Sequence, residues 1–476
     1  MIVQGGMGVA ISGWPLARAV ARLGQLGVVS GTALEIVCAR RLQNGDEGGH
    51  VRRALAAFPD PAVASWILDA YFVEGGKAAT DAFSAVPRWT LTPSRRLQEL
   101  TVAATFVEVF LAKEGHDGPV GINFLRKIEL PLPFGCYGAM LAGVDYVLVG
   151  AGNPSELPAL VRRLAQHDDV EWPVRVQGAT SQDGDRSVRV SPRALLASDA
   201  EALPRPQVLA IVASVDLAAG LAGDPECRPD GFVVEGPAAG GHNAPPRGPR
   251  RLDAAGEPVY DERDVVDVPS IVSLGLPVWL AGSYGTPDGL RRAVAVGATG
   301  VQVGTAFALC SESGLEAGLR EQVLGQVASG EVSVRSDWRV SPTGFPFRVL
   351  ELDDTLSDPA VVSARQRVCD LGALRSPYRT ADGSVDYRCP SEPTAVYTGR
   401  KGGREANTEG RVCLCNALLS SAGLAQQRRG YSEPALVTAG SDFTGVAQLV
   451  VGASDGLTYT AADVVGFLLG EYGAHS

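Results

Sequence analysis

The 476-residue sequence has no apolar run of the length that spans a bilayer, and no charged leader with an apolar core and a cleavage site. We therefore expect a cytoplasmic protein that does not bind a membrane. Positive charge is also in the minority, because 42 lysines and arginines face 53 acidic residues, a net charge of −11. Without a global positive charge or a basic stripe, nucleic acid is not expected as a partner.

Cysteine is scarce as well. Eight cysteines over this length do not make a disulfide scaffold, and in a reducing cytosol most are expected to be thiols. Four of them fall in one 47-residue segment of the tail, which contains a Cys-x-Cys but no Cys-x-x-Cys pair. We therefore expect no metal, and we keep a structural zinc or an iron–sulfur cluster as the alternative for this set. The set is Cys369, Cys389, Cys413 and Cys415.

Only five histidines are present, and four of them lie in polar or terminal settings. The fifth, His242, follows a short β-branched run, 231–235, that breaks into Gly-Pro-Ala-Ala-Gly-Gly. Paired glycines let a backbone approach a ligand closely, and an imidazole titrates near neutral pH. Barrel enzymes and open α/β sheets keep their chemistry at the tips of parallel strands. The pattern predicts an active-site turn with His242 as the proton-transfer residue; the alternative is a histidine hydrogen-bonded within a turn.

Short β-branched runs alternate along the chain with amphipathic stretches rich in Ala, Leu and Arg, which is typical of repeated βα units around a parallel sheet. Eight runs are predicted as strands, the number that closes a barrel. The expected fold class is therefore α/β, a TIM-type (β/α)8 barrel. The predicted strands are 2–5, 27–30, 119–124, 145–149, 208–214, 231–235, 277–281 and 300–303, with helices at 15–26, 97–113, 157–166 and 286–296.

Three segments exceed the simple repeat within a barrel domain predicted at residues 1–320. Residues 33–93 are longer than a crossover requires and predict a helical insertion after the second strand. Residues 174–190 predict a hairpin that turns at 182–185, where Asp-Gly supplies the turn chemistry. The polar excursion 243–267, which begins with a proline-rich loop, predicts a lid over the pocket.

Beyond residue 320 the pattern changes to a mostly helical and irregular C-terminal extension, 321–476. Its apolar content looks thin, so we expect it to pack on the barrel rather than to fold alone. Helices are expected near this boundary and at the end of the chain, at 312–326, 414–427 and 461–469.

Glycines follow the last two predicted strands in register. Gly282-Ser283-Tyr284-Gly285 comes after 277–281, and Gly304-Thr305 comes after 300–303. Each is followed by a helix. A phosphate bound there would meet free backbone N–H groups and the positive end of the helix, and no side chain would stand in its way. In barrels this phosphate site belongs to the last two strands. The alternative is two ordinary βα turns in which the glycines only save space.

Two other strand ends offer surfaces to a flat ring. Gly6 and Met7 lie after the first strand and present bare backbone and one thioether, either as a wall against a ring or as a simple turn. Asn123 ends the third strand among inward-facing apolar residues, where its amide needs a partner. The polar edge of a cofactor ring would supply one, and a backbone group at the strand end is the alternative.

At this point the residues resemble a family. Gly236 to His242, Gly-Pro-Ala-Ala-Gly-Gly-His, resembles the Gly-x-Glu-Ala-Gly-Gly-His motif of nitronate monooxygenases, formerly called 2-nitropropane dioxygenases. FMN-dependent enoyl reductases of fatty-acid and polyketide synthesis share this motif. The likeness extends over roughly residues 1–320. It includes segments similar to the family's first strand, third strand and phosphate-binding pair, namely 2–8, 121–124, 281–285 and 300–305.

The resemblance implies a barrel that holds FMN without a covalent bond. Met7 and Asn123 would face the flavin ring, His242 would be the acid–base residue, and Asn243 beside it would bind substrate. The full set of cofactor-binding residues implied is Gly6, Met7, Asn123, Glu235, Gly240, Gly241, Ala281, Gly282, Ser283, Gly285, Gly304 and Thr305.

The resemblance leaves two reactions open. In a nitronate monooxygenase, His242 would take the carbon-bound proton of a nitroalkane-like acid, and an electron would pass to FMN before O2 enters. In an NAD(P)H-dependent enoyl thioester or quinone reductase, the same imidazole would protonate the carbon next to the carbonyl. We predict the first; the second adds NAD(P)H, an acyl thioester and an acyl carrier protein. A homodimer stays open in both.

The chain departs from the family pattern at three positions within the likeness. Glu235 stands where the family has Gln, Gly6 where it has Pro, and Ile211 where a lysine contacts the cofactor. A carboxylate at position 235 changes the charge near the flavin and raises the basicity of a neighbouring group.

Overall fold

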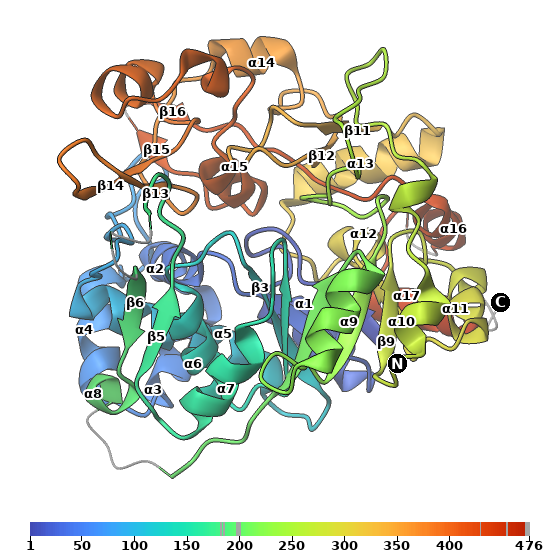
Figure 1. Ribbon diagram of the computed structural model, residues 1–476, viewed down its shortest axis with the longest axis horizontal. Helices are drawn as coiled ribbons and strands as arrows, with labels where there is room; N and C mark the ends of the chain where they lie inside the picture. Colours follow the sequence, from blue (N-terminus) through green and yellow to red (C-terminus); the bar gives the residue numbers. More distant parts are fainter. Residues whose placement is uncertain (181–182, 184–185, 197–200, 429, 454–455, 472–476) are drawn as a thin grey trace.

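All eight predicted strands are present in one parallel sheet of the computed structural model (Figure 1). The sheet runs in the order β1-β10-β9-β8-β7-β4-β3-β2. The Gln4 N–H donates to Leu26 O (2.9 Å) and the Leu26 N–H donates to Ile2 O (3.0 Å), which joins the two edges into a nearly closed barrel. The strands are β1 (Ile2–Gln4), β2 (Gly27–Ser30), β3 (Val120–Leu125), β4 (Tyr146–Gly150), β7 (Gln207–Val212), β8 (Gly231–Glu235), β9 (Val278–Ala281) and β10 (Gly300–Val303). The predicted TIM-type fold is confirmed.

The structure describes residues 1–180, 183, 186–196, 201–428, 430–453 and 456–471. Among these residues, no helix combines the length and the apolar character that a bilayer crossing needs.

Large apolar side chains fill the barrel interior, as expected for strands that are buried on both faces. The interior cluster contains Val3, Val28, Leu148, Leu209, Val233 and Trp279. Gln4 is the buried polar residue at the closing seam, where its side chain accepts from the Val28 N–H (2.9 Å) and donates to Ser12 Oγ (2.9 Å). Because both halves of the amide are satisfied, the seam between β1 and β2 carries no polar penalty.

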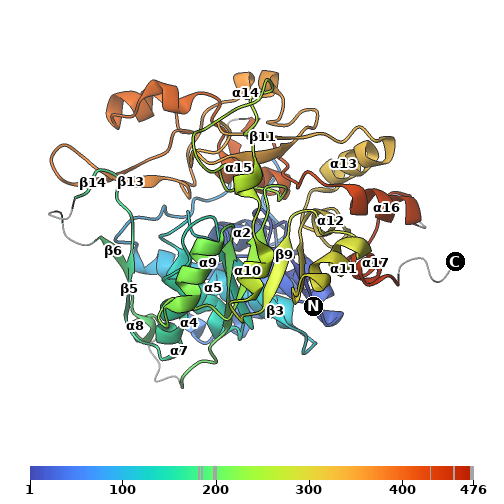
Figure 2. The ribbon, with the colours of Figure 1, turned by 45° about the vertical axis from the view of Figure 1, so that its right-hand side comes forward.

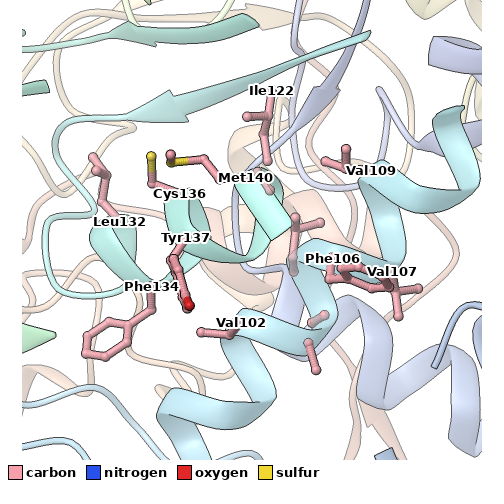
Figure 3. Packing of buried hydrophobic residues seen from close by; sticks show 14 of the residues in the cluster. Val102, Phe106, Val107, Val109, Ile122, Leu132, Phe134, Cys136, Tyr137 and Met140 are labelled. Carbon is pink, nitrogen blue, oxygen red and sulfur yellow. The ribbon is translucent and has the colours of Figure 1, made fainter. Parts of the chain in front are cut away.

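The helices predicted around the barrel are confirmed, with ends shifted by a few residues. α5 and α11 begin where Ser94 and Thr286 accept a hydrogen bond from the N–H three residues on, as N-caps do. Figure 3 shows α5 and α6 packed through aromatic and aliphatic side chains. A Cβ at Gly138 would lie 2.2 Å from Val102 O, so this contact needs glycine. The helices are α1 (Trp14–Arg22), α5 (Arg95–Lys113), α6 (Leu132–Leu141), α7 (Leu157–Ala165), α9 (Val215–Gly223), α10 (Val268–Val272), α11 (Pro287–Ala295) and α12 (Thr305–Ala308).

The insertion after β2 is helical only in its first part, with α2 (Leu34–Gln43), α3 (His50–Ala56) and α4 (Pro61–Tyr71). Residues 72–94 are irregular. Contacts far along the chain hold them: the Leu91 N–H donates to Tyr387 Oη (2.6 Å), and the Phe83 N–H donates to Gln426 Oε1 (2.9 Å). This part of the insertion therefore packs against the C-terminal extension.

The predicted hairpin is present, but its first strand lies earlier than expected. β5 (Val170–Pro173) pairs antiparallel with β6 (Ser187–Val190), and a short helix, α8 (Pro192–Leu196), follows. Val170 and Trp172 are buried and alternate with exposed residues, so their burial sets the register. Of the predicted turn at 182–185, only residue 183 lies within the described residues.

The extension is mostly helical and irregular, as expected, and its described residues also form three two-stranded antiparallel sheets, which the sequence did not predict. Each strand has two to four residues, too short for period-two alternation to be seen in the sequence. The elements are α13 (Ala317–Ser329), β11 (Val334–Asp337), β12 (Phe347–Leu350), α14 (Pro359–Ala364), β13 (Ser376–Arg379), β14 (Val385–Arg388), α15 (Leu414–Ser421), β15 (Gln427–Arg428), β16 (Tyr431–Ser432), α16 (Thr444–Gly452) and α17 (Ala461–Leu469).

The extension covers one end of the barrel and returns to its side (Figures 1 and 2). The segment from β11 to β16 forms a layer over the barrel, whereas α16 and α17 lie beside α11 and α12. Val446 and Val464 share one buried cluster with Leu16 and Phe307 of the barrel. The apolar content of the extension is thus not thin, and the predicted boundary near residue 320 falls inside α13.

A buried ion pair within the extension gives a stability prediction. Arg365 Nε lies 3.0 Å from Glu433 Oε1, and the two side chains are 1% and 3% exposed. Arg365→Met leaves the carboxylate buried without its cation, so we expect a loss of about 3–5 kcal/mol in the free energy of unfolding, measured by urea titration. Arg189→Met is the control, because its pair with Asp169 is 66% and 50% exposed and should contribute under about 1 kcal/mol. Equal losses in both variants would contradict the assignment.

Candidate active site

A cavity of about 300 Å³ lies at the carboxyl ends of the barrel strands, under the extension. All twelve residues predicted to bind the cofactor line it, and His242 lines it too. The glycine turns after β9 and β10 form one part of the wall, and Gly6, Met7 and Asn123 form another. The structure thus gathers residues that lie almost 300 positions apart in the sequence.

Asn243 has a different place from the one predicted. Its side chain is buried, does not line the cavity and donates to Ala239 O (2.7 Å). Its Oδ1 accepts from Ser336 Oγ (3.2 Å), and its N–H donates to Pro346 O (3.0 Å). Because these contacts use both ends of the amide, Asn243 fixes the turn after β8 and does not face the cavity.

The extension holds the turn after β8 in place. The Gly241 N–H donates to Thr438 Oγ1 (2.8 Å), and the Ser441 N–H donates to Ala238 O (3.1 Å). A Cβ at Gly240 would lie 2.8 Å from the carbonyl carbon of Ala439, so the close approach requires glycine there. The glycine pair before His242 therefore serves the contact with the extension as well as the cavity.

Thr305 in the predicted phosphate site also contacts the extension, since its Oγ1 accepts from the Gly440 N–H (2.9 Å). Ser283 adopts a left-handed backbone with φ +63°, next to Gly282 at φ +87°. This sharp turn exposes backbone N–H groups just before α11, whose N-cap is Thr286. The turn after β9 lines the cavity, and its role in holding a phosphate stays a prediction.

A residue of the extension holds His242. The ring Nε2 lies 2.7 Å from Ser341 Oγ, which lies 2.8 Å from Thr343 Oγ1. The ring also meets the edge of Phe347, with centroids 4.9 Å apart. Ser341 Oγ accepts from the Thr343 N–H, so it has room to accept Nε2–H and to donate to Thr343 Oγ1. In that arrangement the Nδ1 lone pair is free to accept a proton.

The imidazole is neutral at physiological pH. Burial, and secondarily the positive charge of Lys127, lower the pKa of His242 to about 3. A neutral ring that stays unprotonated down to acidic pH is able to act as a base but not as a standing cation.

Glu235 and Lys127 bring opposite charges near His242. Burial raises the pKa of Glu235 to about 7, although Lys127 opposes the rise. Burial lowers the pKa of Lys127 to about 7, although Glu235 opposes this shift. Lys127 Nζ also lies 3.5 Å from the ring centroid of Phe345, in a cation–π contact. Glu235 therefore faces the cavity as an acid that titrates near neutral pH.

The raised pKa of Glu235 predicts a pH-dependent stability. The folded state holds this proton more tightly than the unfolded state, so the stabilisation is full below pH 4.5 and is lost as pH rises to about 7. Glu235→Gln does not titrate. The melting temperature of this variant minus that of the parent should therefore increase between pH 5 and pH 8, as measured by circular dichroism. The exposed control, Glu171→Gln, should keep a constant difference. A constant difference for Glu235→Gln would remove the assignment.

Two buried amide oxygens make this cavity suitable for a flavin ring. Asn123 Oδ1 and Gln302 Oε1 are buried without a hydrogen-bond partner among the described residues, and both side chains line the cavity. Buried acceptors normally find a donor. The edge of a flavin ring carries an N–H donor, and the glycine turns leave backbone room for its phosphate. The residues present fit FMN.

Several site residues were not predicted. Gln302 had a detectable signal, since it is a polar residue in a buried strand just before Gly304, as Asn123 is in β3. Lys127 follows β3 in an ordinary loop, and Ser341 and Thr438 lie in the extension. Nothing local in the sequence connects these three with a site at β8.

The four cysteines of the tail lie in segments that contact one another. Asn416 Nδ2 donates to Asp370 Oδ1 (2.7 Å), and Ser391 Oγ donates to Val412 O (2.6 Å). Over the described residues, which include all four cysteines, no group of three or more metal-ligating side chains is arranged to hold a metal. The zinc or iron–sulfur alternative at Cys369, Cys389, Cys413 and Cys415 therefore has no support in the structure. Cys415 instead lines the cavity.

The segment predicted as a lid, 243–267, does not line the cavity. Arg247 Nη2 donates to Ala213 O (2.7 Å), and Glu257 Oε2 accepts from the Ser336 N–H (2.9 Å), which place the segment beside α9 and β11. Residues from 371 to 446 of the extension close the cavity instead.

Comparisons with known proteins find a family likeness in part of the chain. Residues 199–337 match the family model described as nitronate monooxygenase. A nitronate monooxygenase of Pseudomonas aeruginosa is 36% identical over 129 residues, which are 25% of this chain and 32% of that protein. The chain thus aligns with about a third of the length of this curated relative.

Two solved structures are similar to this chain at low sequence identity. An enoyl reductase domain of MlnA from the macrolactin biosynthesis cluster of Bacillus amyloliquefaciens is 12% identical, with a TM-score of 0.51 over 100% of this chain and 94% of that chain. FabK from Thermotoga maritima is 16% identical, with a TM-score of 0.46 over 100% of this chain and 93% of its own. The sequence match at residues 199–337 contains the turn that carries His242 and both glycine turns. Through it, residues 199–337 of the chain are similar to the nitronate monooxygenase family.

Proposed function

We propose that this protein is an FMN-dependent oxidoreductase that oxidises a nitronate or a nitroalkane-like carbon acid with O2. The observation that carries the proposal is the position of His242, a neutral imidazole in the wall of a cavity that also contains two partnerless amide oxygens. The family match supports the reaction class, and the amide oxygens support the flavin.

Each part of the cavity has a role in this proposal. Asn123 and Gln302 would hold the polar edge of the ring, Met7 would lie against its face, and the turns at Gly282 and Gly304 would hold the phosphate. FMN, when bound, supplies an acceptor for the electrons of the substrate.

The chain's own residues handle the proton. His242 Nδ1 accepts the carbon-bound proton of the substrate, and Ser341 keeps the ring in one orientation through Nε2. Lys127 lies close enough to lower the pKa of His242, and its protonated form would favour the anion that proton loss leaves on the substrate. The extension covers the cavity and limits the access of water.

An NAD(P)H-dependent reductase acting on an enoyl thioester or a quinone is the second candidate. Leu371, Leu374 and Leu418 favour it, because they give the cavity an apolar wall that suits a hydrocarbon substrate. In that case His242 would give a proton instead of taking one, and an acyl carrier protein would be a partner.

One experiment separates the two candidates. The protein loaded with FMN is mixed with an alkyl nitronate in air, and O2 consumption is followed without NAD(P)H. Under nitrogen, the flavin absorbance is followed after NADH or NADPH is added. Oxygen uptake driven by the nitronate supports the first function. Rapid bleaching by a nicotinamide, with no oxygen uptake from the nitronate, would overturn it in favour of the second.

A further inference from the structure

The cavity has two unlike ends. The end at β9 and β10 consists of glycine turns and backbone. The other end is lined from α2, α15 and the segments next to them, and its apolar residues include Val9, Ile36, Leu371, Leu374, Leu414 and Leu418. Two of these residues come from the barrel and four from the extension. Such an enclosed apolar surface is typical of small-molecule sites.

Three of these leucines are only half-buried. Leu371 and Leu418 pack on one side against a core cluster that contains Val9 and Ile36, and Leu374 packs against a neighbouring cluster. Each of the three also lines the cavity, so part of its remaining open surface faces the cavity. Apolar surface left open inside a protein gains free energy when an apolar ligand covers it.

Hydrogen bonds fix this end of the cavity in advance. Arg40 of α2 donates through Nη1 to Leu424 O (2.5 Å), just after α15. Gln426 Oε1 accepts from the Phe83 N–H (2.9 Å), and Gln426 Nε2 donates to Phe83 O (3.3 Å). Because α2 and the segment after α15 are tied together, the end between them is preformed and does not need to open by rearrangement.

The charged groups lie away from this end. The cavity is lined by two carboxylates, Glu235 at the tip of β8 and Asp442 before α16, and by no lysine or arginine among the described residues. His242 follows β8 as well. A substrate with a polar reacting head would therefore place the head beside His242 and its tail toward α15.

We infer that the end of the cavity between α2 and α15 binds the unbranched hydrocarbon chain of the substrate, so that this protein prefers carbon acids with long alkyl chains over short ones. The inference rests on the proposed function for the identity of the head group, whereas the chain site depends only on the residues of the wall. The extension supplies most of this wall, and it therefore sets the specificity of the site.

The test measures binding, not turnover. The FMN-loaded protein is titrated under nitrogen with primary nitroalkanes of increasing length, from nitroethane to nitrooctane, by isothermal calorimetry. Each added methylene that enters an apolar site should tighten binding by up to about fourfold, until the site is full. An affinity that does not change with chain length would overturn the inference.

Variants locate the effect. Leu418→Asn places an amide in the wall and should flatten the dependence of the affinity on chain length. Leu371→Ala enlarges the site, so the affinity should continue to rise up to a longer alkyl chain before it levels off. Leu319→Ala is the matched control, because Leu319 is a half-buried leucine of α13 that does not line the cavity. An unchanged profile in both wall variants would place the chain elsewhere and overturn the inference.

The outcome is separable from that of the proposed function. Chain-dependent binding together with an absence of nitronate oxidation would keep the chain site and remove the reaction. Oxidation of nitronates at a rate and affinity independent of chain length would keep the reaction and remove the chain site.

Discussion

Replacing Gly304 with valine is expected to give a colourless protein that no longer retains FMN. A Cβ at Gly304 would meet the flexible side chain of Met7, with Sδ at 3.5 Å and Cγ at 3.9 Å, and the backbone there has φ −107°, which valine accepts. The fold should therefore tolerate the change. The added methyl groups enter the cavity between the turn and the predicted phosphate position, and the phosphate cannot approach the backbone.

The measurement is the visible spectrum of the purified variant, followed by titration with FMN. Circular dichroism and the melting temperature establish that the variant is folded. Gly325→Val is the control, because Gly325 lies on α13 with nothing within 4 Å of its Cβ position. Full yellow colour in folded Gly304→Val would mean that the phosphate lies elsewhere and that the glycine turns are ordinary βα turns.

His242→Ala is expected to retain FMN and to lose turnover by about 10²–10⁴-fold, which is the usual contribution of a positioned acid or base. The imidazole lies in the wall of the cavity and is not part of the glycine turns after β9 and β10. The cofactor should therefore bind as before. The loss should appear in kcat/KM for the carbon acid. It should be much smaller for a preformed nitronate, whose carbon-bound proton is already gone.

The pH profile adds a second readout for His242. Because burial and Lys127 lower its pKa to about 3, the folded enzyme should keep its base down to acidic pH, and kcat/KM should show no acid limb near the usual histidine range. His116→Ala is the control, since His116 bonds only to its own segment after α5. A variant at His242 with the parent's rate on the carbon acid would end the catalytic assignment.

The sequence predicted the barrel well because its signals are local. Each strand from β1 to β10 in the parallel sheet is a short β-branched run, and buried parallel strands need little else to be recognised. The insertion lost its predicted helicity after residue 71 because its last part packs against Tyr387 and Gln426, which lie in the extension. A contact of that range leaves no periodic pattern in the sequence.

The site was predicted in the same uneven way. Strand tips with glycine, such as those before Gly282 and Gly304, are visible in the sequence and do line the cavity. Asn243 was misplaced because its neighbours, Ser336 and Pro346, lie about 100 residues on. Ser341 and Thr438 were missed for the same reason. Motif reasoning thus found the barrel's share of the cavity and none of the share that the extension supplies.

The bonds from Thr438 and Ser441 to the turn after β8 have a consequence for synthesis of the chain. The eight strands of the barrel are synthesised well before the segment that holds the turn carrying His242. The most recently made residues of a nascent chain are still inside the ribosomal exit tunnel. The cavity at the carboxyl ends of the strands therefore stays uncovered until translation of the extension is nearly complete. Cofactor loading should accordingly be a late, post-translational event, and chains stalled or clipped before residue 438 should accumulate without colour.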